Sequence, residues 1–227
     1  MLRIEATPAW HAAHPGACIG VLELSGIVNA VPAPALETLK RRVEEELRET
    51  YGQRERSQLA ELPVLRDYIR YYKRFDKTYH VLLQLESVAR KGKRFPCVSP
   101  LVDANFVAEL RTLVLTAGHD AARLHSPLKV DVSQAGDTIR QMNGSTKTLP
   151  AGDMVMRDAE SICCSILYGQ DDRSPISSAT THALYVAYAP SGVTEEVVRR
   201  QLDAIANTVA AFCSACVVKQ LTLLRGD

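Results

Sequence analysis

The sequence lacks a long hydrophobic run, a strong net charge and a phosphate-binding glycine loop. The uncharged apolar stretch at residues 204–218 is shorter than the roughly 20 apolar residues that a membrane-spanning helix needs. With 27 basic and 26 acidic residues among 227, the formal charge is +1, so any contact with nucleic acid must depend on local clusters of charge. Neither nucleotide-binding glycine motif is present. We therefore expect no membrane contact, no DNA partner and no cofactor.

The cysteines of the sequence show no spacing typical of a disulfide framework. Six cysteines stand at irregular positions, and no secretory signal pattern opens the chain, which favours free thiols and a cytoplasmic location. Cys213 and Cys216 form the single C-x-x-C, and without a second pair they predict buried apolar residues, with no metal site. A cysteine–histidine hydrolase using Cys97, Cys163 or Cys164 stays open, although no motif supports it.

The pattern of apolar stretches, helical periodicity and turn residues predicts one α+β domain over residues 1–227, with mixed or antiparallel sheets and packed helices. Apolar stretches predict strands at residues 17–24, 130–132, 138–142, 154–156, 161–168, 183–188 and 217–224. Helical periodicity predicts helices at residues 36–51, 65–75, 79–90 and 103–117, and a last helix capped by Thr194. Asn143-Gly144 is the strongest turn signal, because glycine tolerates the positive φ of a tight turn.

Two stretches, residues 101–120 and 136–158, resemble the B3/B4 domain of the phenylalanyl-tRNA synthetase beta subunit, and the likeness extends over residues 71–189. The second stretch matches a glycine- and aspartate-rich signature of that family at Gly136, Asp137, Ile139, Met142, Asn143, Gly144, Leu149, Asp153, Met154, Val155 and Asp158. In the first stretch, Val102-Asp103 with Asn105, then Gly118-His119-Asp120, follow the family order. Residues 166–169, Ser174 and Thr180-Thr181 are similar to a later family segment.

The resemblance implies an amino-acid-sized pocket that binds the aminoacylated end of tRNA and hydrolyses the ester of a mischarged amino acid. It implies a free-standing deacylase, with an aminoacyl-tRNA synthetase as a possible partner. The family's pocket asparagine and histidine correspond to Asn105 and His119, expected to be catalytic. Gly169 and the pair Thr180 and Thr181 correspond to pocket walls.

The chain departs from the family at the position expected to read the substrate side chain. Val186 stands where the synthetase has an acid that recognises the tyrosine hydroxyl. Because a site that hydrogen-bonds a hydroxyl rejects analogues lacking it, the loss of that acid predicts a target other than tyrosine. Ile166 and Leu167 replace smaller residues and would reshape the pocket.

Ester hydrolysis requires a positioned water, a proton acceptor and donors for the developing oxyanion. His119 has a suitable pKa for the acceptor, Asn105 could hold the carbonyl, and backbone amides near Gly169 could serve as donors. Simpler interpretations remain for each residue. His119 could satisfy carbonyls at a helix end, Asn105 could be a surface residue, and Asp103 fits a helix N-cap.

A basic segment is the candidate RNA contact. Five of its cations lie three or four residues apart on one predicted helical face, with tyrosines between them that could stack on bases. The segment contains Arg66, Arg70, Lys73, Arg74, Lys77, Arg90, Lys91, Lys93 and Arg94. A solvated charged face over core aromatics is the alternative. For the whole chain, the alternative to a deacylase is a non-catalytic module that binds RNA, an amino acid or a protein.

Overall fold

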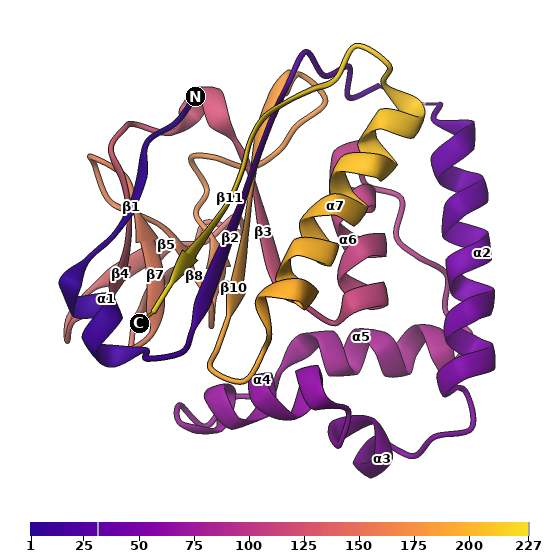
Figure 1. Ribbon diagram of the computed structural model, residues 1–227, viewed down its shortest axis with the longest axis horizontal. Helices are drawn as coiled ribbons and strands as arrows, with labels where there is room; N and C mark the ends of the chain where they lie inside the picture. The colour runs from indigo at the N-terminus through magenta and orange to yellow at the C-terminus, as the bar shows by residue number, and fades with distance from the viewer. Residues whose placement is uncertain (31, 227) are drawn as a thin grey trace.

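The computed structural model describes residues 1–30 and 32–226, and it has an α+β fold. A four-stranded sheet stands in the middle of the molecule, with a five-stranded sheet on one side and most helices on the other (Figure 1). One large cluster of buried apolar residues extends from the helices through both sheets. Within the described residues, no helix is both long enough and apolar enough to cross a membrane.

The four-stranded sheet has the order β11-β2-β10-β3, and all its neighbours are antiparallel. Its strands are β2 (Cys18–Ser25), β3 (Thr116–Asp120), β10 (His182–Ala189) and β11 (Val217–Arg225). Helix α7 (Glu195–Phe212), capped by the Thr194 side chain, packs on one face of this sheet. The approach is close at Gly20, where a Cβ would stand 2.5 Å from Val198 Cγ1.

The five-stranded sheet has the order β1-β4-β7-β8-β9, and only the β1–β4 pair is parallel. Its strands are β1 (Ile4–Ala6), β4 (Leu128–Val132), β7 (Met154–Arg157), β8 (Ile162–Ser165) and β9 (Gly169–Gln170). A hairpin of β5 (Thr138–Arg140) and β6 (Thr146–Thr148) stands beside it. The predicted Asn143-Gly144 turn lies in this hairpin, with Gly144 at φ +81°.

The helices lie on one side of the central sheet and beneath it, apart from α1, which lies beside the five-stranded sheet (Figure 1). Helix α2 lies at the far edge from α1, and α4 and α5 run beneath the sheet in the view of Figure 1. The remaining helical elements are α1 (Pro8–Ala13), α2 (Pro34–Tyr51), α3 (Arg56–Ala60), α4 (Pro63–Lys73), α5 (His80–Ala89), α6 (Pro100–Thr112) and the short 3-10 helix η1 (Ala121–Arg123).

Four buried tyrosines connect α4 and α5 to the rest of the molecule through their hydroxyl groups. Tyr68 donates to Tyr188 O at 2.7 Å, Tyr72 to Ile166 O at 2.6 Å, and Tyr79 to Leu113 O at 2.9 Å. Tyr71 donates to the Asp153 carboxylate at 2.7 Å. Because these rings are at most 4% exposed, the prediction that the tyrosines of α4 stack on RNA bases is wrong.

The helix predicted at residues 103–117 is shorter and begins earlier. It ends at Thr112, because Leu113 takes the left-handed conformation (φ +65°) and the β-branched residues that follow favour the strand β3. Its N-cap is Ser99, and Asp103 lies inside the first turn, where its carboxylate pairs with Lys40 at 2.8 Å. Asp103 is therefore part of a buried ion pair and does not occupy the predicted cap position.

Candidate functional site

A cavity of about 510 Å³ opens between α6, the edge strand β3, strands β8 and β9, and the tip of the β5–β6 hairpin. Asn105 comes from α6 and Gly169 from β9, so two of the residues predicted for the pocket meet in it. Apolar side chains such as Val102, Leu115 and Ile176 form much of its wall. The volume of this cavity lies in the range that is typical of pockets for small organic ligands in proteins.

The most unusual group in the cavity wall is Glu109, which the sequence analysis did not single out. It lies one helical turn after Asn105 on α6 and is only 5% exposed. Burial raises the pKa of its carboxyl to about 8, against a weaker opposing effect of the hydrogen bond from Thr116 N–H. Glu109 is therefore mainly a neutral acid at pH 7, with a pKa suited to proton transfer near neutral pH.

Asn105 and Glu109 of α6 bind the backbone of the same residue on β3. Glu109 Oε2 accepts from Thr116 N–H at 3.0 Å, and Asn105 Nδ2 donates to Thr116 O at 2.8 Å. This leaves Glu109 Oε1 without a hydrogen bond to any described residue, and Asn105 Oδ1 is buried without a partner in the described chain. An unpaired buried oxygen such as Asn105 Oδ1 is rare in proteins, and both oxygens are available to a ligand.

Strand β3 is an edge strand, and its alternation directs a further donor to the cavity. Leu115 O pairs with Tyr188 N–H of β10, so the backbone groups of Thr116, Gly118 and Asp120 point to the opposite side. Thr116 is bound by α6, and Asp120 N–H donates to Ser174 O at 2.9 Å. Gly118 N–H faces the same side between them, and Gly118 lines the cavity.

Gly118 also keeps the cavity open. A Cβ at this position would lie 2.8 Å from Ile176 Cδ1 and 3.1 Å from the Tyr185 ring. Both neighbours line the same cavity. Glycine at this position therefore contributes space as well as an accessible N–H.

His119 lies outside this cavity. Its side chain is fully buried on the other face of β3, where Nδ1 lies 2.8 Å from Ser174 Oγ. Because Ser174 Oγ–H donates to Asp171 at 2.6 Å, the serine oxygen accepts from His119 Nδ1–H. Burial lowers the pKa of His119 to about 4, so the ring is neutral. The geometry gives His119 a structural position and does not support a catalytic role.

The other predicted wall residues are also separate from the cavity. Thr180 is buried and donates to Asp120 Oδ2 at 2.9 Å, which shapes the loop before β10. Thr181 is exposed. Val186 is buried in β10 between Val21 and Ala117, with its neighbour Tyr185 in the cavity wall instead. None of these three residues lines the cavity.

The family model of the B3/4 domain matches residues 65–213. The chain belongs to the B3/4 domain family. This match includes the whole of α6, β3, β8, β9 and the hairpin that surround the cavity, and it confirms the family resemblance predicted from the sequence.

Among solved structures, the chain is similar to an N-terminal fragment of the phenylalanyl-tRNA synthetase beta-subunit from Pyrococcus horikoshii, with 8% identity and a TM-score of 0.48. The similarity covers 93% of this chain and 49% of that fragment, so this B3/4 protein spans about half the fragment's length. A comparison with curated proteins gave no match.

The basic segment of the B3/4 protein divides into paired and unpaired cations. Arg66 and Arg70 pair with Asp67, Arg90 pairs with Glu55 and Glu86, and Arg94 pairs with Glu44. Within the described residues, no ion pair forms at Lys73, Arg74, Lys77, Lys91 or Lys93. Lys77 Nζ lies 5.2 Å from the centre of the Tyr168 ring, and Tyr168 lines the cavity. Of the unpaired cations, Lys77 therefore lies beside the wall of the cavity.

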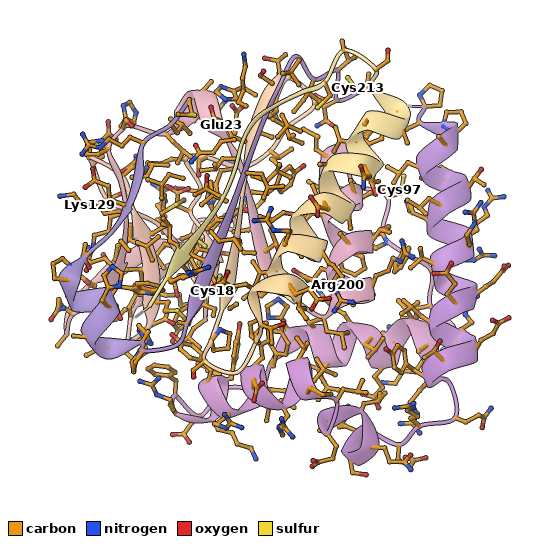
Figure 2. The ribbon with its side chains drawn as sticks, viewed as in Figure 1. Cys18, Glu23, Cys97, Lys129, Arg200 and Cys213 are labelled. Atoms are coloured by element: carbon orange, nitrogen blue, oxygen red, sulfur yellow. The ribbon has the colours of Figure 1, made fainter. Side chains whose placement is uncertain are left out.

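One cluster of side chains outside the cavity has a metal-like spacing. Ligand atoms of Glu37, Cys97 and Asp103 lie within 4.8 Å of one another, and Cys97 belongs to the loop that runs beside α2 (Figure 2). Lys40 Nζ already lies 2.9 Å from Glu37 Oε1 and 2.8 Å from Asp103 Oδ2. The lysine ammonium supplies the positive charge that these carboxylates need.

A thiol nucleophile has no support in the cavity. Cys164 lines it, but burial raises the pKa of this thiol to about 12, so the reactive thiolate is scarce at neutral pH. Cys163 points to a different environment, where burial also raises its pKa. Cys97 is exposed and does not line the cavity. The cysteine–histidine hydrolase considered from the sequence therefore has no activated thiol among the residues that line this cavity.

Proposed function

We propose that this B3/4 protein binds the aminoacylated end of tRNA and hydrolyses the ester of a mischarged amino acid in the cavity beside Glu109. The observation that carries the proposal is the convergence of three groups in one pocket: the free Glu109 Oε1, the unpartnered Asn105 Oδ1 and the Gly118 N–H of an edge strand. Hydrolysis by water requires a base that takes a proton, a hydrogen-bond acceptor that holds the substrate, and a hydrogen-bond donor that stabilises the oxyanion.

Each group has a distinct task in the proposed reaction. Asn105 Oδ1 accepts from the α-ammonium group of the aminoacyl ester, which holds the ester over Gly118. Glu109, as the carboxylate, takes a proton from water while the water oxygen attacks the ester carbonyl carbon. Gly118 N–H donates to the oxyanion that forms. When the bond to the ribose oxygen breaks, Glu109 returns the proton to that oxygen, and the products are the free amino acid and deacylated tRNA.

The unpaired cations at the end of α4 and in the following loop support an RNA substrate. Lys73, Arg74 and Lys77 form no ion pairs with described residues, and Lys77 stands over the Tyr168 ring at the cavity wall. Unpaired cations attract backbone phosphates, and contacts of this kind supply most of the affinity for nucleic acid. Arg90 and Arg94 are engaged by carboxylates and are weaker candidates than the sequence suggested.

The test is to incubate the protein with a panel of aminoacyl-tRNAs and measure loss of the ester. We expect hydrolysis of one or a few of them and a loss of at least 100-fold in Glu109→Gln, the range that general base catalysis contributes. Glu196→Gln makes the same chemical change on the exposed face of α7 and should leave the rate unaltered. Binding of tRNA without hydrolysis of any ester would instead identify a non-catalytic binding module.

A further inference from the structure

A second cavity, of about 320 Å³, lies on the outer side of α4, where the turn after α1 meets the loop before α7. It shares no lining residue with the first cavity. The polar groups in its wall come from three separate segments of the chain. They are His14, Asp67, Arg70, Tyr71, Arg74 and Ser191.

The charges that face this second cavity do not cancel. Arg70 lies 3.1 Å from the Asp67 carboxylate and neutralises it. Arg74 has no carboxylate within ion-pair distance in the part of the chain described, and its guanidinium lies 5.4 Å from the ring centres of both Tyr71 and Phe75. Asp67 is also fixed by packing, since a Cβ on Gly192 would lie 2.5 Å from its Oδ2. One uncompensated positive charge therefore remains at the cavity.

His14 is the second sign of a ligand. The residue forms the C-cap of α1 and is 5% exposed, and its Nε2 atom is buried without a hydrogen-bond partner among the described residues. Burial, with a smaller contribution from the Arg74 charge, lowers the pKa of His14 to about 4, so the ring is neutral and has one N–H to donate. A buried ring nitrogen without a partner is uncommon unless a ligand completes it.

We propose that this second cavity binds a phosphate group, held by the guanidinium groups of Arg70 and Arg74 with His14 and the Ser191 hydroxyl as further donors. Arginine matches phosphate because its planar fork presents parallel N–H groups at the spacing of the phosphate oxygens. Stacking on Tyr71 and Phe75 fixes the plane of the Arg74 guanidinium in advance of binding. Asp67 keeps Arg70 in place without removing the net positive charge.

The position of the cavity indicates where the phosphate comes from, and this step depends on the proposed function. Arg74 is only three residues from Lys77, which contacts Tyr168 at the wall of the first cavity. An RNA whose aminoacylated end enters the first cavity would therefore pass a backbone phosphate near the second. The other source of the same chemistry is a small molecule that carries a phosphate group.

The site itself can be tested without RNA. Inorganic phosphate is titrated into the full chain, labelled with ¹⁵N in histidine, and the ring signals of His14 are followed by NMR. We expect these signals to shift as phosphate saturates the site. Arg74→Gln should raise the dissociation constant for phosphate by about tenfold, as expected for the loss of one charged hydrogen-bond donor. Arg42→Gln, an exposed change on the distant helix α2, is the matched control and should bind like the wild type.

Two results would overturn the site: His14 signals that do not respond to phosphate, or the same dissociation constant in Arg74→Gln and the wild type. The backbone amide spectrum of each variant shows whether it is folded. His14→Gln, which keeps a side-chain donor, provides a second variant and should weaken binding less than Arg74→Gln.

Deacylated tRNA then identifies the source of the phosphate. If the phosphate belongs to RNA, tRNA displaces inorganic phosphate, and Arg74→Gln reduces the slope of log affinity against log salt by about one. If tRNA does not displace it, the cavity serves a small phosphate-bearing molecule. Hydrolysis of aminoacyl-tRNA without phosphate binding refutes this site alone, whereas phosphate binding without hydrolysis of any ester refutes the deacylase alone.

Discussion

Asn105 and Glu109 bind the two polar groups of one peptide residue, Thr116, from successive turns of α6. The Asn105 amide donates to the Thr116 carbonyl, and the Glu109 carboxyl accepts from the Thr116 N–H, as a neighbouring strand would. These two bonds fasten the first residue of the edge strand β3 to α6. They also hold the remaining oxygens of both side chains at the wall of the first cavity. The structural contact and the proposed catalytic arrangement thus share the same residues.

Replacing Glu109 by glutamine should make stability less dependent on pH. The pKa of Glu109 rises from 4.5 to about 8 on folding, so between these values the folded state holds a proton that the unfolded state has lost. Stability of the wild type therefore falls by up to about 1.4 kcal/mol per pH unit in this window and levels off above it. We expect Glu109→Gln to match the wild type near pH 4 and to exceed it by about 2–4 kcal/mol at pH 9. Urea unfolding at both pH values measures this, and an equal difference at both would contradict the buried neutral acid.

Adding a methyl group at Gly118 should narrow the first cavity. In Gly118→Ala the new Cβ would come within 2.8 Å of Ile176 Cδ1 and 3.1 Å of the Tyr185 ring, so Ile176, which lines the cavity, must shift. We expect ester hydrolysis to fall while the fold is retained. Ile176→Val removes Cδ1, so the double variant should recover part of the rate. Unchanged rates in Gly118→Ala would show that the substrate does not reach β3.

Removal of the Tyr71 hydroxyl group should lower the stability of the fold. Tyr71 donates to Asp153 at 2.7 Å and accepts from Met154 N–H at 2.7 Å, and all three groups are buried. Tyr71→Phe leaves Asp153 Oδ1 and the Met154 N–H unpaired and should reduce the free energy of unfolding by about 1–3 kcal/mol. Tyr51→Phe is the control, because the Tyr51 hydroxyl makes no hydrogen bond with described residues. A similar loss in both variants of a urea titration would argue against the buried network.

Thiol reactivity should follow burial. Cys97 is exposed, whereas Cys163 and Cys164 are buried with raised pKa values. Iodoacetamide at pH 8 should therefore modify Cys97 in the native protein and reach the other two only in urea, as mass spectrometry of digested samples can show. Hydrolysis should survive this treatment, because no step uses a thiol. Loss of activity that tracks modification of Cys164 would restore the cysteine hydrolase as an explanation.

Much of the fold could be predicted from the sequence because its signals are local. The amphipathic helices α2 and α7 follow the 3.6-residue period, and the Thr194 cap and the Asn143-Gly144 turn lie where their chemistry requires. The short elements β1 and α3 were missed, since three to five residues carry little periodic signal. The predicted boundary between α6 and β3 was also wrong. The helix ends where Leu113 takes a left-handed conformation, and the sequence has no glycine at this position to indicate it.

The candidate site could be predicted only in part, and the error at the α6–β3 boundary explains why. Once residues 116–120 form a strand, alternation places His119 on the face opposite Gly118. A catalytic role for His119 depended on the family order of residues, which carries no information about the side of a strand. Glu109 had a signal in the sequence, since it stands four residues after Asn105 and therefore on the same face of the helix. Its raised pKa depends on burial, which only the fold determines.

The most direct test of the account is the rate of aminoacyl-tRNA hydrolysis as a function of pH, after subtraction of the uncatalysed rate. If the Glu109 carboxylate is the base, the enzymatic rate at saturating substrate rises tenfold per pH unit below about pH 8 and becomes constant above it. Glu109→Gln should lack this component, and Glu196→Gln should keep it. An enzymatic rate that is the same in Glu109→Gln and the wild type across this range would contradict the central claim that hydrolysis occurs beside Glu109.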